Sequence, residues 1–262
     1  MKKQTITSII QAKGKRKLSM ITAYDALFSR LFDGEVDFIL VGDSLNMSFG
    51  GNEDTLNIGI DEMIYHTKAV CNGAPNSLVI CDMPFGSYTD ERQALDNAIK
   101  VYTKTKANAV KIEGGKSKAH IIKTLTSNSI AVCGHIGLMP QNVRIEGGYK
   151  IKGKTQKEID ELIEDAKAVE EAGAFAMVVE GVKPEAAKAI TEAVNIPTIG
   201  IGAGVDTDGQ VLVWSDMLGF FDEFKPKFVR DYLNGAKLVK QSIKSYVKDV
   251  QNKQFPLENE IY

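Results

Sequence analysis

Ionisable side chains stand at the ends of several short apolar runs of this sequence. They are Asp25, Asp43 with Ser44, Asp82, Lys111 with Glu113, His135 and Glu180. If the runs are parallel strands, their carboxyl ends meet at one edge and bring these side chains together. Carboxylates gathered in this way repel one another unless a cation lies among them. The pattern therefore predicts a functional cluster, although a single Asp in such a place, Asp25 for example, fits the simpler role of a helix N-cap.

Three of these residues predict a metal site. Asp43, Asp82 and Glu113 offer oxygen donors, without paired histidines or cysteines, which favours Mg²⁺ or Mn²⁺ over Zn²⁺. Such an ion could bind a 2-oxo acid through its carboxylate and ketone oxygens and stabilise the enolate formed when the adjacent C–H proton is removed. Glu180, at the end of the apolar run MVVE, is the remaining carboxylate. We expect it to be the general base.

Two further residues are expected to bind substrate. Lys111 and Glu113 are two positions apart on one expected strand, so both side chains point to the same face. There the ammonium group of Lys111 could hold an anionic substrate group, and a simple salt bridge across the barrel mouth is the alternative. His135 ends a run in CGHIG and is expected to contact substrate. His66 and His120 stand in helical segments, where surface or core positions are expected.

The elements that must position these residues alternate between apolar runs and longer segments with helical period. The eight runs are Ser19 to Tyr24, Phe38 to Gly42, Leu78 to Cys81, Ala109 to Ile112, Ala131 to Gly134, Phe175 to Val179, Thr198 to Ile201 and Val211 to Trp214. The clearest helices are Ile60 to Asn72, Thr89 to Lys104, Gln156 to Ala172, which follows the capping pair Thr155 and Glu158, and the amphipathic stretch Pro226 to Lys248. This alternation is typical of repeated βα units.

The sequence therefore predicts an α/β fold, a (β/α)₈ TIM barrel. We expect a single domain over residues 1–262, with an N-terminal helical segment and a C-terminal helix and tail. The connection from Ile136 to Lys154 is rich in Gly and polar residues and lacks a helical period. A loop of this length is usually a lid or a binding loop.

Composition excludes several classes of partner. Hydrophobic residues make up 44% and charged residues 25%, which is ordinary for a globular protein, and the net charge of −2 gives no reason to bind nucleic acid. We find no signal peptide and no apolar run long enough for a membrane span. Cys71, Cys81 and Cys133 are expected to be buried, reduced thiols. We expect a cytoplasmic protein that acts on small molecules.

Longer motifs resemble those of the ketopantoate hydroxymethyltransferase family. They are ITAYDALFSRLF, ILVGDSLNM, VICDMPFGSY, AVKIEGG, VCGHIGLMPQ, GGYKIKG, IPTIGIGAG, DGQVLV and KPKFVRDY. They occur in the order expected for the family and cover nearly the whole chain. One departure is Gly181, which follows the expected base where the family pattern leads us to expect Cys.

The resemblance implies transfer of a hydroxymethyl group from 5,10-methylenetetrahydrofolate, as co-substrate, to 3-methyl-2-oxobutanoate, which gives 2-dehydropantoate in pantothenate biosynthesis. It implies a bound Mg²⁺ near Asp43, Asp82 and Glu113. Substrate-binding positions would be Asp43, Ser44, Asp82 and Lys111, and Glu180 would accept the proton. Members of the family typically form homodecamers, and we expect a homo-oligomer of this kind.

Two alternatives remain open at this point. One is a Mg²⁺-dependent 2-oxo acid lyase of the isocitrate lyase or phosphoenolpyruvate mutase type, although the KKCGH-type cysteine motif of those enzymes is missing from this sequence. The other is a barrel without catalytic activity that serves as a scaffold or binding module.

Overall fold

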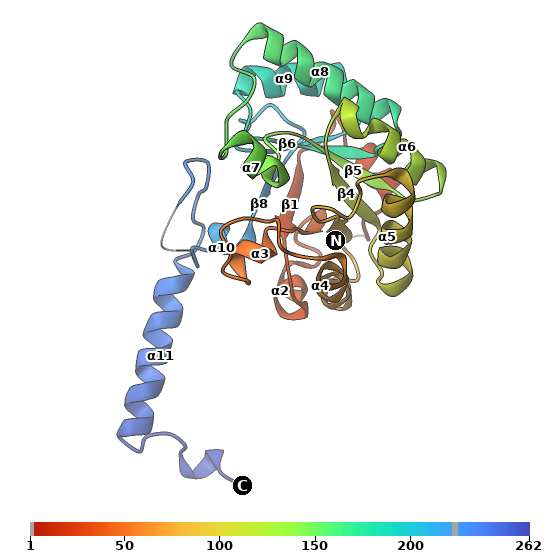
Figure 1. Ribbon diagram of the computed structural model, residues 1–262. Coiled ribbons are helices and arrows are strands. Elements are labelled where there is room, and N and C mark those ends of the chain that lie inside the picture. The colour runs from red at the N-terminus through yellow and green to blue at the C-terminus, as the bar shows by residue number, and fades with distance from the viewer. Residues whose placement is uncertain (1–2, 222–224) are drawn as a thin grey trace. The chain divides into compact units, whose positions relative to one another are not determined.

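Eight parallel strands close into a barrel. The computed structural model describes residues 3–221 and 225–262. The strands pair in chain order, and the last pairs with the first. Figure 1 shows β8 beside β1. They are β1 (Leu18–Thr22), β2 (Phe38–Val41), β3 (Leu78–Asp82), β4 (Ala109–Glu113), β5 (Val132–Gly137), β6 (Ala176–Glu180), β7 (Thr198–Ile201) and β8 (Gly209–Leu212). The predicted (β/α)₈ barrel is confirmed.

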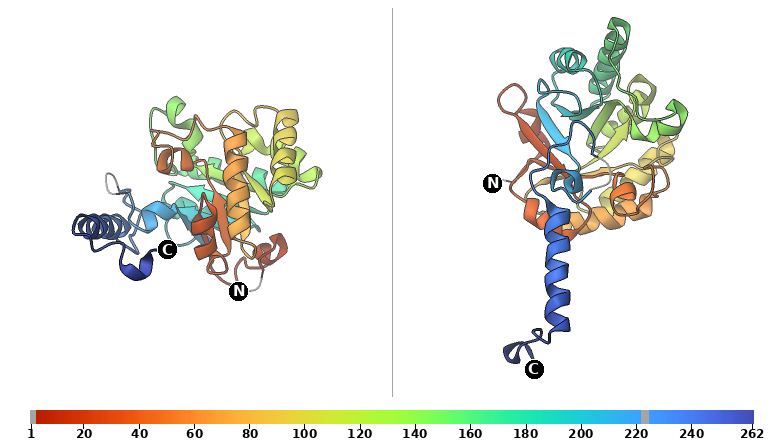
Figure 2. Two further views of the ribbon diagram at one scale, coloured as in Figure 1. Left: turned by 90° about the horizontal axis from the view of Figure 1, so that it is seen from below. Right: turned by 90° about the vertical axis from the view of Figure 1, so that its left-hand side faces the viewer.

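Helices surround the strands on the outside of the barrel, as the two views of Figure 2 show. The α-helices of this part are α1 (Ile6–Ile10), α2 (Ala26–Phe32), α3 (Leu45–Ser48), α4 (Ile60–Gly73), α5 (Glu91–Lys104), α6 (Ala119–Ser127), α7 (Val143–Glu146), α8 (Gln156–Glu171) and α9 (Pro184–Ala193). Two short 3₁₀ turns, η1 (Lys116–Lys118) and η2 (Pro140–Asn142), lie in loops that follow strands. The expected N-terminal helical segment is α1.

The chain divides into two compact units, up to residue 213 and from residue 214. The second unit contains α10 (Trp214–Met217), α11 (Gly235–Gln251) and the 3₁₀ turn η3 (Glu258–Glu260). Helix α11 carries apolar side chains such as Leu238 and Ile243 that the rest of this unit leaves exposed. That the chain is a single domain stays a prediction.

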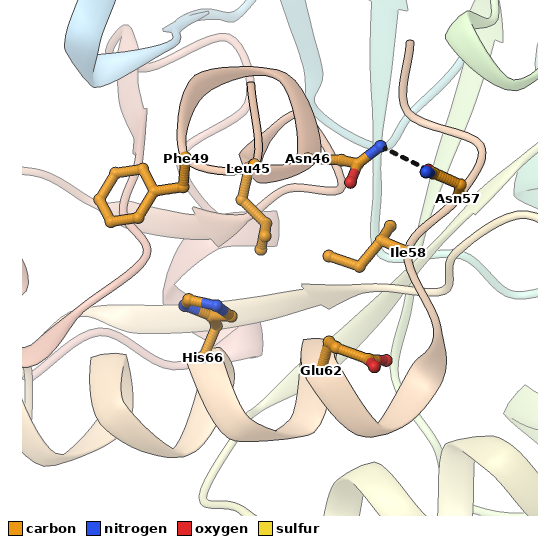
Figure 3. Close-up of a pocket in the computed structure, with 8 residues that line it drawn as sticks. Leu45, Asn46, Phe49, Asn57, Ile58, Glu62 and His66 are labelled. Atoms are coloured by element: carbon orange, nitrogen blue, oxygen red, sulfur yellow. Dashed lines mark hydrogen bonds between the residues drawn. The ribbon is translucent and has the colours of Figure 1, made fainter. Parts of the chain in front are cut away.

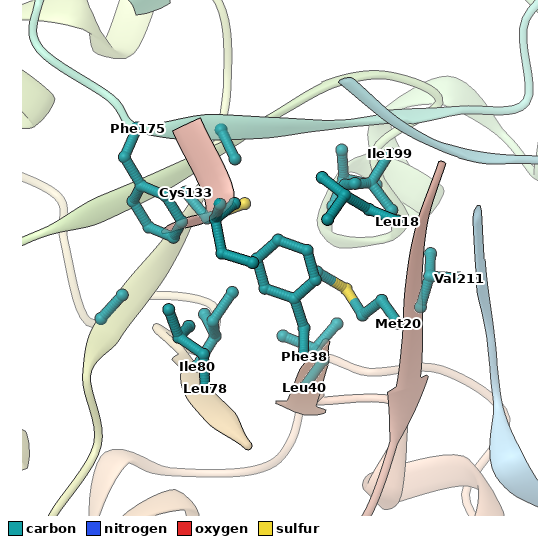
Figure 4. Close-up of a cluster of buried hydrophobic side chains, with 14 of the residues drawn as sticks. Leu18, Met20, Phe38, Leu40, Leu78, Ile80, Cys133, Phe175, Ile199 and Val211 are labelled. Atoms are coloured by element: carbon teal, nitrogen blue, oxygen red, sulfur yellow. The ribbon is translucent and has the colours of Figure 1, made fainter. Parts of the chain in front are cut away.

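The apolar runs of the sequence form strands that are covered on both faces. All four residues of β2 are buried, and alternate residues point to opposite sides. Phe38 and Leu40 belong to the cluster inside the barrel, as Figure 4 shows, with the Phe38 ring beside Met20. Ile9 of α1 belongs to the same cluster. This cluster includes the first residues of several strands, so the opposite, carboxyl ends remain for polar side chains.

Two helix starts show why the sequence folds as expected. Thr155 caps α8 by accepting a hydrogen bond from the Glu158 N–H group, and Glu158 in turn accepts from the N–H of Lys154 rather than that of Thr155. Asp25 caps α2 by accepting from the N–H groups of Leu27 and Phe28. Asp25 therefore has the simpler role, a helix N-cap.

Several predicted boundaries are wrong. Strand β5 ends at Gly137 rather than at Gly134, so His135 lies within the strand. The last strand begins at Gly209, not at Val211, and ends before Trp214, which starts α10. A Cβ atom on Gly209 would lie 2.6 Å from the Leu18 carbonyl oxygen, so β8 can approach β1 closely there only because this residue is glycine. The C-terminal helix begins at Gly235 rather than Pro226, and its N-cap is Asn234.

The connection after β5 is partly helical. It was expected to lack helical structure, but η2 and α7 form within it. Pro140 starts the first of these turns, and Gly147, with a φ of 66°, ends the second. A segment of two single turns is too short to show a helical period in its sequence.

All three cysteines are free and buried, as expected. Burial raises the pKa of Cys71 to about 11 and the pKa of Cys81 and Cys133 to about 12, so the thiols stay protonated at neutral pH. No helix within residues 3–221 and 225–262 is long and apolar enough to cross a membrane.

One ion pair joins the segment before β1 to the residue before β2. It predicts a contribution to stability that is lost in acid. Buried Asp37 accepts hydrogen bonds from the Arg16 guanidinium group, at 2.6 and 2.9 Å, and from the Ser19 N–H group. Burial alone would raise the pKa of Asp37, but these hydrogen bonds outweigh it and hold the pKa below its usual range. The contribution is therefore present above the ordinary carboxyl pKa of about 3.9 and is lost as pH falls below it.

We expect Arg16→Met to lower the free energy of unfolding by about 1–2 kcal/mol at pH 7, because the guanidinium group is half-exposed. The difference from the wild type should shrink as pH falls below about 4. Urea unfolding at a series of pH values measures the loss at pH 7 and its change with pH. An equal loss at every pH would contradict the assignment, and Arg92→Met, at an exposed pair on α5, is the matched control.

Candidate active site

The predicted site residues lie together at the carboxyl ends of neighbouring strands. Strand register places Asp82 beside Lys111, and Glu113 beside His135. Glu180 ends β6 and pairs with Gly137 of β5. Side chains from five consecutive strands, β2 to β6, therefore meet at one mouth of the barrel, as the rule for such folds requires.

Lys111 lies at the centre of this cluster. Its Nζ atom is 2.7 Å from Asp82 Oδ1, 3.9 Å from Glu113 Oε1 and 3.2 Å from His135 Nδ1. Burial alone would lower the pKa of Lys111, but the neighbouring carboxylates, Asp82 first, outweigh it and raise the pKa. The side chain is therefore a buried, charged ammonium group.

The contacts of His135 determine its tautomer. Burial lowers the pKa of His135, and the charge of Lys111 lowers it further, so the ring is neutral at pH 7. An ammonium group can only donate, so Nδ1 accepts from Lys111 and the ring proton is on Nε2. Nε2 lies 3.3 Å from Glu180 Oε2. The ring therefore connects Lys111 to Glu180 and presents an N–H group to that carboxylate.

Glu180 keeps contact with solvent, in contrast to the residues around it. Its side chain is 22% exposed, whereas those of His135 and Glu113 are each 3% exposed. A carboxylate that ends a buried strand and still reaches the open mouth can exchange a proton with a bound molecule. This position agrees with the role of general base expected for it.

The backbone of Asp43 contacts Asp82, and the residues on either side of Asp43 lie close to other groups of the site. Its N–H group donates to Asp82 Oδ2 at 3.0 Å. A Cβ atom on Gly42 would lie 2.8 Å from Ser44 Oγ, so glycine at this position leaves room for that hydroxyl. Ser44 Oγ is 2.8 Å from the hydroxyl of Tyr24, which places Ser44 beside the cluster.

The buried charges of the site are suited to a cation. Burial raises the pKa of Asp43 to about 7, and the nearby charge of Asp82 adds to the effect. Burial also raises the pKa of Glu113, whose Oε1 atom is buried without a hydrogen-bond partner among the described residues. Three buried carboxyl groups share one lysine, so a further cation would relieve their repulsion.

The oxygen donors fit Mg²⁺ or Mn²⁺ in type. In residues 3–221 and 225–262, no three acidic, His or Cys side chains are grouped closely enough to hold an ion by themselves. Mg²⁺ commonly uses only one or two protein carboxylates and completes its shell with water and substrate. Asp43 and Asp82 are direct neighbours, because the Asp43 N–H group donates to Asp82 Oδ2. The metal site at Asp43, Asp82 and Glu113 stays a prediction.

Two residues of the site were missed by the sequence reasoning. Gln141, in η2, donates its side-chain N–H groups to Asp43 and to the Met83 carbonyl oxygen, and its backbone N–H group donates to Glu113. Tyr88 donates its hydroxyl to Gln141 Oε1. Gln141 ends the motif VCGHIGLMPQ, but it lies in a loop and does not end a strand. The strand-end rule therefore does not point to it.

Of two pockets among the described residues, the second has residues of the cluster in its lining and the first does not. One of about 350 Å³ lies between α3, the following loop and α4, and Figure 3 shows His66 and Glu62 on one side of it and Phe49 on the other. His66 donates from Nδ1 to the carbonyl oxygen of Tyr24, so it is a structural residue of α4. His120 is exposed on α6. The second pocket, of about 210 Å³, includes Glu113 and Gln141 in its lining.

The family model described as ketopantoate hydroxymethyltransferase matches residues 3–258. The chain belongs to the ketopantoate hydroxymethyltransferase family. A relative in Aliarcobacter butzleri named 3-methyl-2-oxobutanoate hydroxymethyltransferase is 65% identical, over 99% of this chain and 97% of the relative. A relative of the same name in Wolinella succinogenes is 62% identical over the full length of both chains.

The fold of this ketopantoate hydroxymethyltransferase family member is similar to that of a wider group of solved barrels. One is phosphonopyruvate hydrolase in complex with oxalate and Mg²⁺, with a TM-score of 0.63 and 11% identity over 98% of this chain and 93% of the other. At that identity the similarity concerns the fold alone. The expected resemblance of this chain to the family is confirmed by the sequence matches.

Proposed function

We propose that this protein transfers a hydroxymethyl group from 5,10-methylenetetrahydrofolate to 3-methyl-2-oxobutanoate, with consumption of one water, to give 2-dehydropantoate. The observation that carries the proposal is the connected row Lys111, His135 and Glu180, beside the buried carboxylates Asp43 and Asp82. This row combines the Lys111 ammonium group, which can bind an anionic substrate, with the Glu180 carboxylate, which can remove a proton. The names of the relatives support the same reaction.

Lys111 and Ser44 are suited to bind the 2-oxo acid. The ammonium group of Lys111 would attract the substrate carboxylate, and the Ser44 hydroxyl, beside Tyr24, offers a hydrogen bond. Because Lys111 is fixed by Asp82, it needs no rearrangement when substrate arrives. His135 as a direct substrate contact stays a proposal, since its described contacts are with protein groups.

Glu180 would remove the proton from C3 of the substrate. His135 Nε2 lies 3.3 Å from this carboxylate, so the ring would help to hold the base in place. The resulting carbanion is delocalised onto the ketone oxygen, and its C3 forms a bond to the methylene carbon supplied by the folate. Both C–N bonds from that carbon to the folate break, water supplies the hydroxyl group, and tetrahydrofolate leaves with the two remaining protons on its nitrogens. Lys111 would balance the negative charge of the substrate during this step.

We propose that a divalent cation, Mg²⁺ first, binds at Asp43, Asp82 and Glu113. It would supply charge stabilisation for the oxygens of the 2-oxo acid. The support within this chain is the excess of buried carboxylates and the raised pKa of Asp43 and Glu113. The Mg²⁺ of the phosphonopyruvate hydrolase complex lies in a protein of similar fold.

Folate as co-substrate, a cytoplasmic location and a homodecamer are further proposals. Exposed apolar side chains on α11, among them Leu238 and Ile243, support association of several copies, because such rows are usually covered in an oligomer.

Product analysis tests the function. The protein is incubated with 3-methyl-2-oxobutanoate and Mg²⁺, with and without 5,10-methylenetetrahydrofolate. We expect 2-dehydropantoate only when the folate is present. Cleavage of a 2-oxo acid substrate without folate would favour the lyase alternative, and no reaction of either kind by the folded protein would favour the scaffold alternative.

A further inference from the structure

Gln141 connects two of the buried carboxylates through hydrogen bonds from one residue. Its backbone N–H group donates to Glu113 Oε2 at 3.1 Å, and its side-chain Nε2 donates to Asp43 Oδ2 at 2.9 Å. The side chain is buried, at the mouth of the barrel. The two acceptors belong to different strands, since Asp43 follows β2 and Glu113 ends β4.

The orientation of the Gln141 amide is determined by its other partners. Nε2 also donates to the carbonyl oxygen of Met83 at 3.1 Å, and a carbonyl can only accept, so the NH₂ group must lie on this side. The Tyr88 hydroxyl donates to Oε1 on the other side. Both side-chain hydrogens are therefore used, one on Asp43 Oδ2 and one on the Met83 carbonyl oxygen.

This arrangement fixes the orientation of the two carboxylates. The amide of Gln141 cannot turn without losing the Met83 and Tyr88 hydrogen bonds, so its Nε2–H group stays directed at Asp43 Oδ2. The backbone N–H group of Gln141 contacts Glu113 Oε2 in the same way. One residue thereby holds two acidic side chains that belong to different strands.

We propose that Gln141 is a positioning residue that prepares the carboxylates of Asp43 and Glu113 for the divalent cation. This inference rests on the proposed metal-dependent function. Gln141 acts through these carboxylates and through Tyr88, which fixes its amide. Its place in the loop after β5 also makes cation binding depend on that loop being folded against β2 and β4.

The test is the affinity for Mn²⁺, measured by electron paramagnetic resonance on the intact protein without substrate. Gln141→Met keeps a side chain of similar length and removes both amide contacts. We expect its Kd for Mn²⁺ to rise by about 10- to 100-fold, the usual effect of removing a group that orients metal ligands. Gln156→Met, at an exposed position of α8, is the matched control and should bind Mn²⁺ as the wild type does.

The outcomes separate the inference from the proposed function. A wild type that binds no Mn²⁺ contradicts the metal-dependent function, whereas tight binding by both the wild type and Gln141→Met overturns only the role of Gln141. If Gln141→Met does not fold, Tyr88→Phe carries the test, because it removes only the hydroxyl that fixes the amide. We expect about a three- to tenfold rise in Kd for that variant, and an unchanged Kd overturns the inference.

Discussion

Replacing Glu180 by glutamine should lower kcat for 2-dehydropantoate formation by about 10²- to 10⁴-fold, the usual contribution of a positioned general base. Glutamine has nearly the same size and can keep the close contact with His135 Nε2, but it cannot take up a proton at neutral pH. The KM for 3-methyl-2-oxobutanoate should change little, because Lys111 and the neighbouring carboxylates remain. Steady-state kinetics measures both constants.

A second readout isolates proton removal from the transfer step. In D₂O without folate, the wild type should exchange the C3 hydrogen of 3-methyl-2-oxobutanoate, and Glu180→Gln should be slowed by a similar factor. Glu185→Gln, exposed at the start of α9, is the matched control and should behave as the wild type does. Exchange by Glu180→Gln at the wild-type rate would remove Glu180 from the role of base.

Asp82→Asn should abolish Mn²⁺ binding and lower the free energy of unfolding by about 3–5 kcal/mol, the usual cost of breaking a buried charge pair. Both Asp82 oxygens face donors: Oδ1 is near the Lys111 ammonium group, and Oδ2 accepts from the Asp43 N–H group. An asparagine has only one carbonyl oxygen, so its NH₂ group would face a donor in either orientation. Lys111 would also lose its closest counter-charge.

Urea unfolding and Mn²⁺ titration measure the two effects of Asp82→Asn. Asp96→Asn, on the exposed face of α5, makes the same chemical change where the side chain is 65% exposed, and should alter neither property. Normal Mn²⁺ affinity in folded Asp82→Asn would argue against a metal site at this residue. It would also favour a structural role for the Asp82–Lys111 pair.

The barrel and most of the site could be predicted from strand ends because both depend on local sequence. Continuous apolar runs indicate buried parallel strands, and the first polar residue after each run must lie at the barrel mouth. This rule points to Asp43, Asp82 and Glu180. Their placement at one mouth follows from the closure of the barrel, which the alternation of elements implies.

Gln141 and Tyr88 could not be found by the same rule. Gln141 reaches Asp43 only because the loop after β5 folds back over the mouth, and no local pattern records that path. Tyr88 follows β3 by several residues and meets Gln141 from another loop. Residues that act through such long-range contacts require the three-dimensional structure.

Gly181 shows how backbone geometry explains a departure from the family pattern. Cys was expected after the base, yet residue 181 has a φ of 56°, in the left-handed region where glycine is favoured. A Cβ atom there would lie 2.8 Å from the Leu138 Cβ atom. Glycine therefore lets the chain turn directly after Glu180 without displacing the loop that carries Gln141.

The most direct test of the account follows one carbon atom. The protein, Mg²⁺ and 3-methyl-2-oxobutanoate are supplied with 5,10-methylenetetrahydrofolate labelled with ¹³C at the methylene carbon, and the products are followed by NMR. We expect the label in the new hydroxymethyl group of 2-dehydropantoate, at a rate that falls when the metal is removed by a chelator. Failure of the folded, metal-loaded protein to move the label would contradict the assigned reaction.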